Sequence, residues 1–434
     1  MAGQIRRLID AIVKQRAKGN PTIALTTKAK LALKGIPPDL FNENSTDDPA
    51  VLARLKAIAA DFGVGVTTPI TTAYSTKPLP DAVADLKQQC GDRRPKLVLF
   101  FGSARYDSPA LSRQMQEAFP EACVAGCSTA GEIACGTMLN GSVVAIFLDE
   151  DIVEDAAFDV VEDISRETCV RAAFSKFERH FKAPISSLDL RKHVGLVLVD
   201  GLSGAEERLM ERIGDATDVF FIGGSAGDDL KFESTHVLAN GKSYGDAAVL
   251  LLLRLKRGFE IIKTQSFRPA GRTLAATRVD ERLRKVIEFN HKPALDAYAE
   301  TLDLAPEQAA SQFLHHPLGL MIEEEPFVRS PKRVEDRSIV FYCRIKQGTE
   351  LAVLETTDIV ADTRAAIEAH RGALGGIQGL IEFQCCLRTQ QLRNEDRGDQ
   401  YGAIFSGIPM VGFSTYGEAY LGHMNQTSTI LAFR

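Results

Sequence analysis

Three short stretches of the chain combine glycine, small hydroxyl residues and an acid. They read GCSTAGE at residues 126–132, GGSAGD at 223–228 and GFSTYGE at 412–418, and the middle copy is one residue shorter. Glycine permits positive φ and lets backbone N–H groups converge on one point, while serine and threonine hydroxyls add adaptable donors and acceptors. The acid that ends each copy suits an ammonium or other cationic group, or a positioned water. We therefore predict a binding site for a small polar ligand.

The tail GHMNQTSTILAFR at 422–434 places a second polar cluster directly after the third copy. Backbone donors and hydroxyls would hold the ligand carboxylate, and a motif acid would hold its amine. The candidate ligand-binding residues are Ser128, Thr129, Gly131, Glu132, Gly224, Ser225, Asp228, Ser414, Thr415, Glu418, His423 and Asn425.

Two other interpretations of these residues stay open. Small residues at strand ends can serve close packing alone, with the acid capping a helix. A motif serine could instead be a nucleophile with His423 as its base. However, GCSTAG and GFSTYG lack the spacing of a G-x-S-x-G elbow, and the glycine patterns follow neither a Rossmann nor a P-loop template. We therefore expect no catalytic residues and no enzyme.

Each motif copy follows an apolar run that is typical of a buried strand. The runs at 96–103 (KLVLFFGS) and 193–204 (HVGLVLVDGLSG) open units of strand, turn, helix and strand, and FQCCLR at 383–388 opens a third. Loops at the carboxyl ends of sheet strands are where α/β proteins bind ligands. We predict an α/β fold of two related lobes, with mixed sheets and flanking helices.

Two finer predictions concern single turns. Ser203 and Glu206 have the spacing of a capping box at a helix start. Gln347-Gly348 lies between two β-rich runs and predicts a hairpin.

The first 64 residues form a small helical appendix in this interpretation. Ile5, Leu8 and Ile12 recur at helical spacing, TIALTTKAKLALKG at 22–35 predicts a second helix, and Asp47 or Asp48 caps a third that starts near Pro49. Residues 1–35 hold eight Lys/Arg and one Asp. This basic surface is either a solvated helix face or a docking face for an acidic partner protein.

Composition limits the partners. The 434 residues carry a net charge of −6, which argues against nucleic acid as a partner. The N-terminus lacks an apolar signal region, and the longest apolar stretch, 247–253, is far below the ~20 residues of a membrane span. We expect no membrane attachment.

The eight cysteines show neither CxxC nor zinc spacing, which predicts no metal site. We expect reduced, mostly buried thiols in a cytoplasmic protein. A redox role for Cys123, Cys127 and Cys135 is the alternative.

The motifs FFGS, GCSTAGEI, GGSAGDD, KPALDAY and GFSTYGE…HMNQT occur in the order seen in FIST-domain proteins. Over roughly residues 66–434 the chain resembles that family of bacterial and eukaryotic signal-transduction proteins. The resemblance implies a FIST N-type domain at 65–280 and a FIST C-type domain at 281–434. It also implies a cytoplasmic sensory module for a small ligand, with amino acids proposed, and a separate partner such as a histidine kinase or a cyclic-di-GMP enzyme.

One branch of the family is similar around FFGSARYDSPALSRQMQEAFP at 100–120. Its members are nitric-oxide-sensing haem proteins that act on a histidine kinase. Haem needs an axial histidine in an apolar pocket, and His315, His316 and His423 are the candidates. We predict no cofactor and keep haem-based sensing as the alternative.

Overall fold

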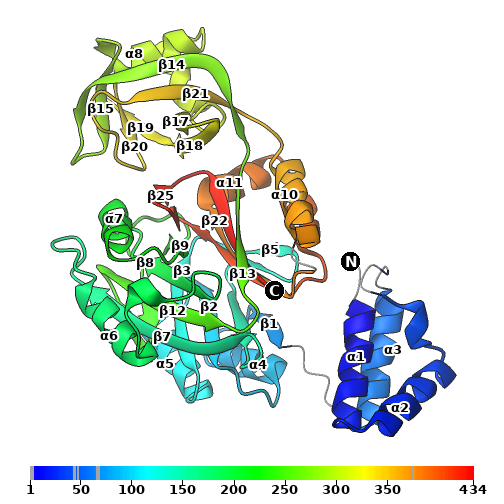
Figure 1. Cartoon of the computed structure of the whole chain (residues 1–434). Coiled ribbons are helices and arrows are strands. Elements are labelled where there is room, and N and C mark those ends of the chain that lie inside the picture. Colours follow the sequence, from blue (N-terminus) through cyan, green and yellow to red (C-terminus); the bar gives the residue numbers. More distant parts are fainter. Residues whose placement is uncertain (1–3, 43–44, 46–47, 65–68, 374–375) are drawn as a thin grey trace. The chain divides into compact units, whose positions relative to one another are not determined.

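The computed structural model describes residues 4–42, 45, 48–64, 69–373 and 376–434. The chain divides into two compact units, unit 1 over Met1–Pro69 and unit 2 over Ile70–Arg434 (Figure 1). Within the described ranges, every helix is too short or too polar to cross a membrane.

Unit 1 is the predicted helical appendix. Its elements are α1 (Gln4–Ala17), α2 (Pro21–Leu33), the short 3₁₀ helix η1 (Pro38–Leu40) and α3 (Pro49–Asp61). The Asn20 side chain caps α2 by accepting from the N–H groups of Thr22 and Ile23. Ile5, Ile9 and Leu55 are fully buried in a core that the three α-helices share. The helices therefore form as the apolar spacing predicts. Of the two proposed caps of α3, Asp47 lies outside the described residues, and Asp48 accepts from the N–H of Ala50 (2.8 Å).

Unit 2 contains one structural plan three times. A first strand is followed by a helix, two parallel strands joined by a second helix, a motif loop, a short hairpin and a last strand. In repeat 1 the elements are β1 (Ile70–Ser75), α4 (Asp81–Cys90), β2 (Leu97–Ser103), α5 (Ser108–Ala118), β3 (Cys123–Thr129), β4 (Glu132–Ala134), β5 (Thr137–Leu139) and β6 (Val143–Leu148).

Repeat 2 follows the same order. Its elements are β7 (Val153–Glu162), α6 (Arg171–Phe181), β8 (His193–Val199), α7 (Glu206–Ala216), β9 (Phe221–Ser225), β10 (Val237–Ala239), β11 (Lys242–Tyr244) and β12 (Ala247–Leu255), with the 3₁₀ helix η2 (Ile185–Ser187) before β8.

Repeat 3 begins with β13 (Phe259–Gln265) and resumes after a long insertion. Its other elements are α10 (Ile359–Ala373), β22 (Gly379–Cys385), α11 (Cys386–Asn394), α12 (Gly398–Gly402), η4 (Ala403–Phe405), β23 (Met410–Thr415), β24 (Glu418–Tyr420), β25 (His423–Met424) and β26 (Thr427–Phe433).

The insertion forms a separate lobe of unit 2, the insert lobe, above the three-repeat body in Figure 1. It is an eight-stranded sheet with α8 packed on it. Its elements are β14 (Phe267–Asp280), β15 (Lys285–Phe289), β16 (Lys292–Pro293), α8 (Ala294–Thr301), α9 (Pro306–Ala309), η3 (Ala310–Gln312), β17 (Leu318–Ile322), β18 (Glu325–Arg329), β19 (Pro331–Glu335), β20 (Ser338–Phe341) and β21 (Glu350–Thr356).

The predicted α/β fold of two lobes with mixed sheets is confirmed, and the internal similarity runs through the three repeats of the body. Repeat 3 begins at Phe259, ahead of the predicted domain boundary at 280/281. The predicted domain ranges remain a prediction.

The repeats exchange their hairpins in a closed cycle. In the described residues each repeat builds four strands of a six-stranded sheet, in which two central strands run parallel, and the last two strands come from another repeat. Hairpin β4–β5 of repeat 1 joins the sheet of repeat 3, β24–β25 of repeat 3 joins that of repeat 2, and β10–β11 of repeat 2 joins that of repeat 1. No repeat can therefore complete its sheet alone.

The inner faces of the three sheets share one apolar core. Phe101, Phe383 and Phe413 meet there, with ring centroids of Phe101 and Phe413 4.6 Å apart. Helices α4 and α5 cover the outer face of the first sheet, and α6 and α7 that of the second. The buried runs at β2 and β8 confirm the predicted strands, since every residue in each is buried.

Two predictions about single turns are wrong. Ser203 and Glu206 do not form a capping box, because the Glu206 carboxylate pairs with Arg284 of the insert lobe (3.0 Å) and Ala205 is the N-cap without a side-chain bond. The runs around Gln347-Gly348 do not pair as a hairpin. Strand β20 pairs with β15 and β19, while β21 pairs with β14 and β17. In both cases, contacts with residues distant in the sequence take the place of the local pairing that the sequence pattern predicts.

The first glycine of each motif is required by the parallel strand beside it. An added Cβ at Gly126 would lie 2.0 Å from the Phe100 carbonyl oxygen, and at Gly223 1.8 Å from that of Val197. An added Cβ at Gly412 would lie 2.5 Å from the backbone carbonyl oxygen of Glu382. These carbonyls belong to equivalent positions, so one packing constraint recurs three times.

We predict that Gly223→Ala lowers the free energy of unfolding by about 1–3 kcal/mol, because the new methyl group must displace the backbone of β8. Gly214→Ala is the matched control, since its Cβ meets nothing within 4 Å and it lies in α7. It should raise stability by up to about 1 kcal/mol. Urea unfolding of both variants measures the difference, and equal stabilities would contradict the constraint.

Candidate functional site

The three motif loops meet and bond to one another. Several backbone N–H groups of the loops bond carbonyls of another repeat, and three of these bonds close a ring. They run from Ala130 to Ser414 (3.1 Å), from Tyr416 to Ser225 (3.2 Å) and from Gly227 to Ser128 (3.0 Å). The residues predicted from three distant segments are thus brought together at the carboxyl ends of the parallel strands.

Glu132 and Glu418 occupy equivalent positions and hold their loops in the same way. One Glu132 oxygen accepts from the Thr129 hydroxyl, and the other accepts from the N–H (2.9 Å) and hydroxyl (2.6 Å) of Ser142. In the third repeat the donors are the Thr415 hydroxyl (2.7 Å) and the N–H (3.1 Å) and hydroxyl (2.7 Å) of Thr427. Both carboxyls are buried. Their oxygens close the hairpins of their own repeats.

Asp228 is not the counterpart of these two glutamates. Val237 takes that position, since it pairs with Cys127 as Glu132 pairs with Phe413. Asp228 instead accepts from the Tyr416 hydroxyl and from three backbone N–H groups, those of Phe232 (2.9 Å), Glu233 (2.6 Å) and Ser234 (2.9 Å). Burial raises its pKa, but these hydrogen bonds outweigh it and leave the pKa of Asp228 below its ordinary value. Asp228 therefore orders the loop between β9 and β10, which we call the middle loop. This loop is longer than the other two motif loops because residues 229–236 separate the motif from its hairpin.

The motif hydroxyls and glycines also serve contacts within the ring. The Ser128 hydroxyl accepts from the N–H of His236 (2.9 Å), and the Ser414 hydroxyl bonds that of Thr389 (2.7 Å). Gly131 has φ +126°, a left-handed value that favours glycine. A Cβ on Gly224 would lie 2.6 Å from the Thr415 side chain. Ser225 is buried.

His423 and Asn425 lie in the third hairpin and are buried. The His423 ring packs on Gly417, where an added Cβ would lie 2.0 Å from its Cε1. Burial lowers the pKa of His423 and favours the neutral ring. Neither amide atom of Asn425 has a hydrogen-bond partner among the described residues. Asn425 is thus the predicted site residue with bonding capacity left unused.

A pocket of about 200 Å³ opens beside the ring, between the body and the insert lobe. We call it the loop pocket. The body contributes the turn after β8, the middle loop and Tyr416, and the insert lobe contributes β19 and β20 with the turns beside them. It is lined by Gly201, Leu202, Glu206, Phe232, Leu283, Arg284, Lys332, Arg333, Val340, Phe341, Tyr342 and Tyr416.

Aromatic rings and cations face each other in the loop pocket. Phe232 stacks on Tyr416 with ring centroids 4.6 Å apart, and Lys332 Nζ lies 5.0 Å from the Phe232 centroid and 5.3 Å from that of Tyr342. Arg284 is held by Glu206 (3.0 Å) and Glu207 (2.6 Å), whereas Lys332 has no ion-pair partner among the described residues. Lys332 is an exposed residue, but partial desolvation of its ammonium group in the pocket lowers its pKa.

None of the twelve predicted site residues lines the loop pocket, although Tyr416 lies inside the third motif. Sequence reasoning missed Phe232, Lys332 and Tyr342. The one available signal was the stretch 229–236, which separates the middle motif from its hairpin and has no counterpart in the other copies. The lining from the insert lobe carries no motif of its own.

Repeat 3 also contains a closed polar layer between its sheet and helices. Glu382 stands where repeats 1 and 2 have Phe100 and Val197, as the register against the motif glycines shows. Among the described residues, the buried Arg388 side chain donates to the hydroxyls of Thr264, Ser266 and Thr363 at 3.0–3.4 Å. One oxygen of Glu382, Oε1 of Gln384 and Nε of Arg388 lack partners among the described residues. Such buried groups are suited to ordered water.

The cysteines are free thiols, five of them buried, while Cys135 and Cys169 are exposed. This agrees with the predicted reduced and mostly buried state. The described residues contain no group of three or more His, Cys, Asp or Glu side chains placed to hold a metal ion.

Residues 96–292 match the FIST N domain and residues 294–420 match the FIST C domain, together more than half of the chain. The chain belongs to the FIST-domain proteins. FIST domains are generally sensory domains of signal transduction that bind small ligands.

A curated relative is "Uncharacterized protein MJ1623" of Methanocaldococcus jannaschii, which is 23% identical over 338 residues. The match covers 73% of this chain and spans 65% of the length of that relative.

We predict that stability falls as pH rises from about 4.5, partly because of Glu418. Burial, and then the nearby Cys385 thiol, raise the pKa of Glu418 well above its ordinary value of 4.5, and the bonds from Thr427 and Thr415 offset this only in part. The folded state then binds more protons than the unfolded state above that pH, so the contribution is present at low pH and lost as pH rises through the folded pKa.

Glu418→Gln should therefore flatten the decline of the unfolding free energy as the pH rises above about 4.5. Exposed Glu350 supplies the control, and Glu350→Gln should keep the wild-type slope. Chemical denaturation at several pH values measures both slopes. An unchanged slope in Glu418→Gln would exclude Glu418 as its source.

Proposed function

We propose that this protein is a non-catalytic sensor that binds a compact carboxylate ligand, such as an amino acid, in the loop pocket. The observation that carries the proposal is Lys332, a cation without an ion-pair partner among the described residues, set against two aromatic side chains. A carboxylate would pair with its ammonium, and the apolar part of the ligand would lie on Phe232 and Tyr416. A volume of about 200 Å³ favours a ligand of amino-acid size.

The position of the loop pocket supports a role in signalling. A ligand there touches the middle loop and Tyr416 on one side and the insert lobe on the other. Binding that depends on both sides favours the arrangement in which they are closest, and this is how a ligand shifts a conformational equilibrium. On the body side of the pocket, three features would hold the ligand-contacting residues in place. They are the ring of backbone bonds between the motif loops, the hydrogen bonds to Asp228 and the stacking of Phe232 on Tyr416. The resemblance to the family adds a separate partner, a histidine kinase or a cyclic-di-GMP enzyme, and a cytoplasmic location.

The twelve residues first predicted remain a second version of the same site. Asn425 supports it, because its amide lacks partners inside the protein. The motif acids support it less, since Glu132 and Glu418 already accept three hydrogen bonds each.

The haem alternative has weaker support. Within the described part of the chain, no histidine lines the loop pocket, and none lines a second pocket of about 490 Å³ near the turn between β12 and β13. Nδ1 of His316 bonds the Leu354 carbonyl oxygen (3.1 Å), and His423 packs on Gly417. A Soret band in the purified protein that is lost on replacing one of these histidines would reverse the choice.

We predict that Lys332→Ala weakens binding of the best carboxylate ligand by about 1.5–3 kcal/mol, since a charge-assisted contact is lost. Thermal-shift screening of amino acids and small carboxylates identifies the ligand, and calorimetry measures the change. Lys346→Ala, another exposed lysine that lines neither pocket, should leave affinity unchanged.

Two results would contradict the loop pocket as the site. One is a broad screen without any ligand that raises the melting temperature. The other is binding that survives Lys332→Ala and Phe232→Ala but is lost in Asn425→Ala, which would place the ligand inside the motif ring.

A further inference from the structure

A second pocket, of about 490 Å³, lies at the opposite ends of the strands of repeat 2, where repeat 2 passes into repeat 3. We call it the turn pocket. Its walls are the segment before β8, the residue before β9, the turn between β12 and β13, the end of β24 and the C-terminal residue. It is lined by Asp189, Leu190, Arg191, Lys192, Phe220, Lys256, Arg257, Gly258, Phe259, Glu260, Ile261, Tyr420 and Arg434, and it shares no residue with the loop pocket.

The turn pocket is basic in a chain whose net charge is −6. Five of its lining residues are Lys or Arg and two are acids. Both acids are engaged, Asp189 by Arg191 (3.4 Å) and Glu260 by Arg434, while Lys256 pairs with Asp151 outside the pocket (3.2 Å). Lys192 and Arg257 have no ion-pair partner among the described residues, and both are exposed. Lys192 interacts electrostatically with Asp189 but forms no close ion pair with it. An anion can therefore reach two exposed cations that hold no close ion pair.

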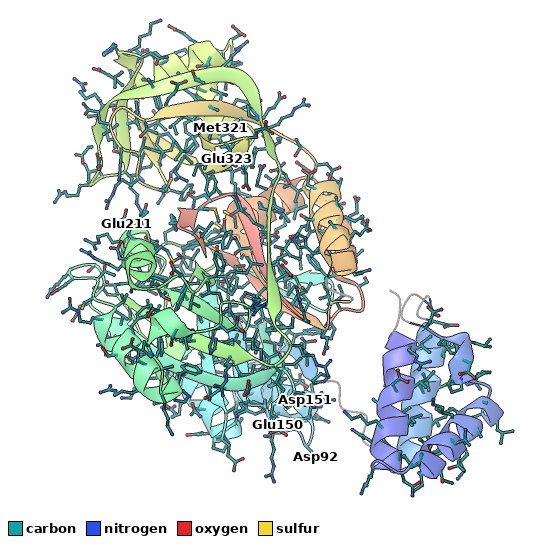
Figure 2. The ribbon with its side chains drawn as sticks, in the orientation of Figure 1. Asp92, Glu150, Asp151, Glu211, Met321 and Glu323 are labelled. Carbon is teal, nitrogen blue, oxygen red and sulfur yellow. The ribbon has the colours of Figure 1, made fainter. Side chains whose placement is uncertain are left out.

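The repeats supply an internal comparison for this charge. The turn that joins repeat 1 to repeat 2, between β6 and β7, reads Asp149-Glu150-Asp151-Ile152, and Figure 2 labels two of its acids. The turn at the same point between repeats 2 and 3 reads Lys256-Arg257-Gly258. The fold thus accepts either sign at this turn, and the basic sequence is not a requirement of the turn itself.

An apolar wall stands beside the cations. Phe220 and Leu190 are 39% and 42% exposed, so both side chains are accessible to a ligand. The Phe220 and Tyr420 rings lie with centroids 6.2 Å apart at an angle of 34°. A flat ring system placed against them would cover this surface, as bases stack on aromatic side chains in nucleic-acid proteins.

We propose that the turn pocket binds a nucleoside phosphate. Its phosphate would pair with Lys192 and Arg257, and its base would lie against Phe220 and Tyr420. Arginine beside lysine suits a phosphate dianion, because the guanidinium offers a planar pair of donors. The volume falls within the range of small-molecule sites. This site is independent of the loop pocket and goes beyond the proposed carboxylate sensing.

The test uses the full chain and isothermal titration with AMP and GMP, and with adenosine and inorganic phosphate as partial ligands. At least one nucleotide should bind at least about tenfold more tightly than either partial ligand, because each partial ligand lacks one half of the contacts. Lys192→Ala and Arg257→Ala should each weaken that nucleotide about tenfold or more. Higher salt should weaken it as well.

Two matched lysine variants separate this proposal from the one above. Lys346→Ala controls for general charge, and Lys332→Ala for the loop pocket; neither should change nucleotide affinity. Thermal unfolding of the Lys192 and Arg257 variants should match the wild type, since both side chains are exposed. Absence of nucleotide binding at about 1 mM, equal affinity for inorganic phosphate and nucleotide, or loss of binding in Lys332→Ala would each overturn the proposal.

Discussion

The architecture of unit 2 depends on the exchange of hairpins around a closed cycle. Each six-stranded sheet takes its last two strands from another repeat, so the edge strand of each repeat is covered by a neighbour. The exchange places all three motif loops at one point, because each loop is the connection between a parallel strand and the hairpin that leaves. Gly126, Gly223 and Gly412 follow from this constraint, since each lies against a carbonyl of the adjacent parallel strand.

Function is expected where the three repeats differ, since the shared features mainly maintain the frame. Repeat 3 is split by the insert lobe, and the middle loop is lengthened toward that lobe. Together these two departures create the loop pocket. A third departure is the basic turn between β12 and β13. The polar layer around Glu382 and Arg388 is a fourth, in place of the apolar core that Phe100 and Val197 provide in the other repeats.

The motif acids illustrate how one pattern serves different ends. Glu132 and Glu418 close their hairpins with matching sets of hydroxyl and backbone donors. Asp228 follows the same glycine pattern in sequence but caps its own loop and orients Tyr416. The difference arises because residues 229–236 separate Asp228 from the hairpin, so Val237 reaches the position that the glutamates occupy elsewhere.

The sequence by itself determined the local elements and the internal repetition. Apolar runs and capping residues depend on near neighbours along the chain, so β2, β8 and the helices of unit 1 could be predicted, as could the threefold motif. Only the tertiary structure decided which hairpin joins which sheet. It also decided that the Glu206 carboxylate pairs with Arg284 and that Lys332 of the insert lobe lies over the Phe232 ring of the body. These contacts join residues about a hundred or more positions apart or involve partners that no local pattern specifies. The pockets consist of such contacts, and therefore their lining could not be predicted from the motifs.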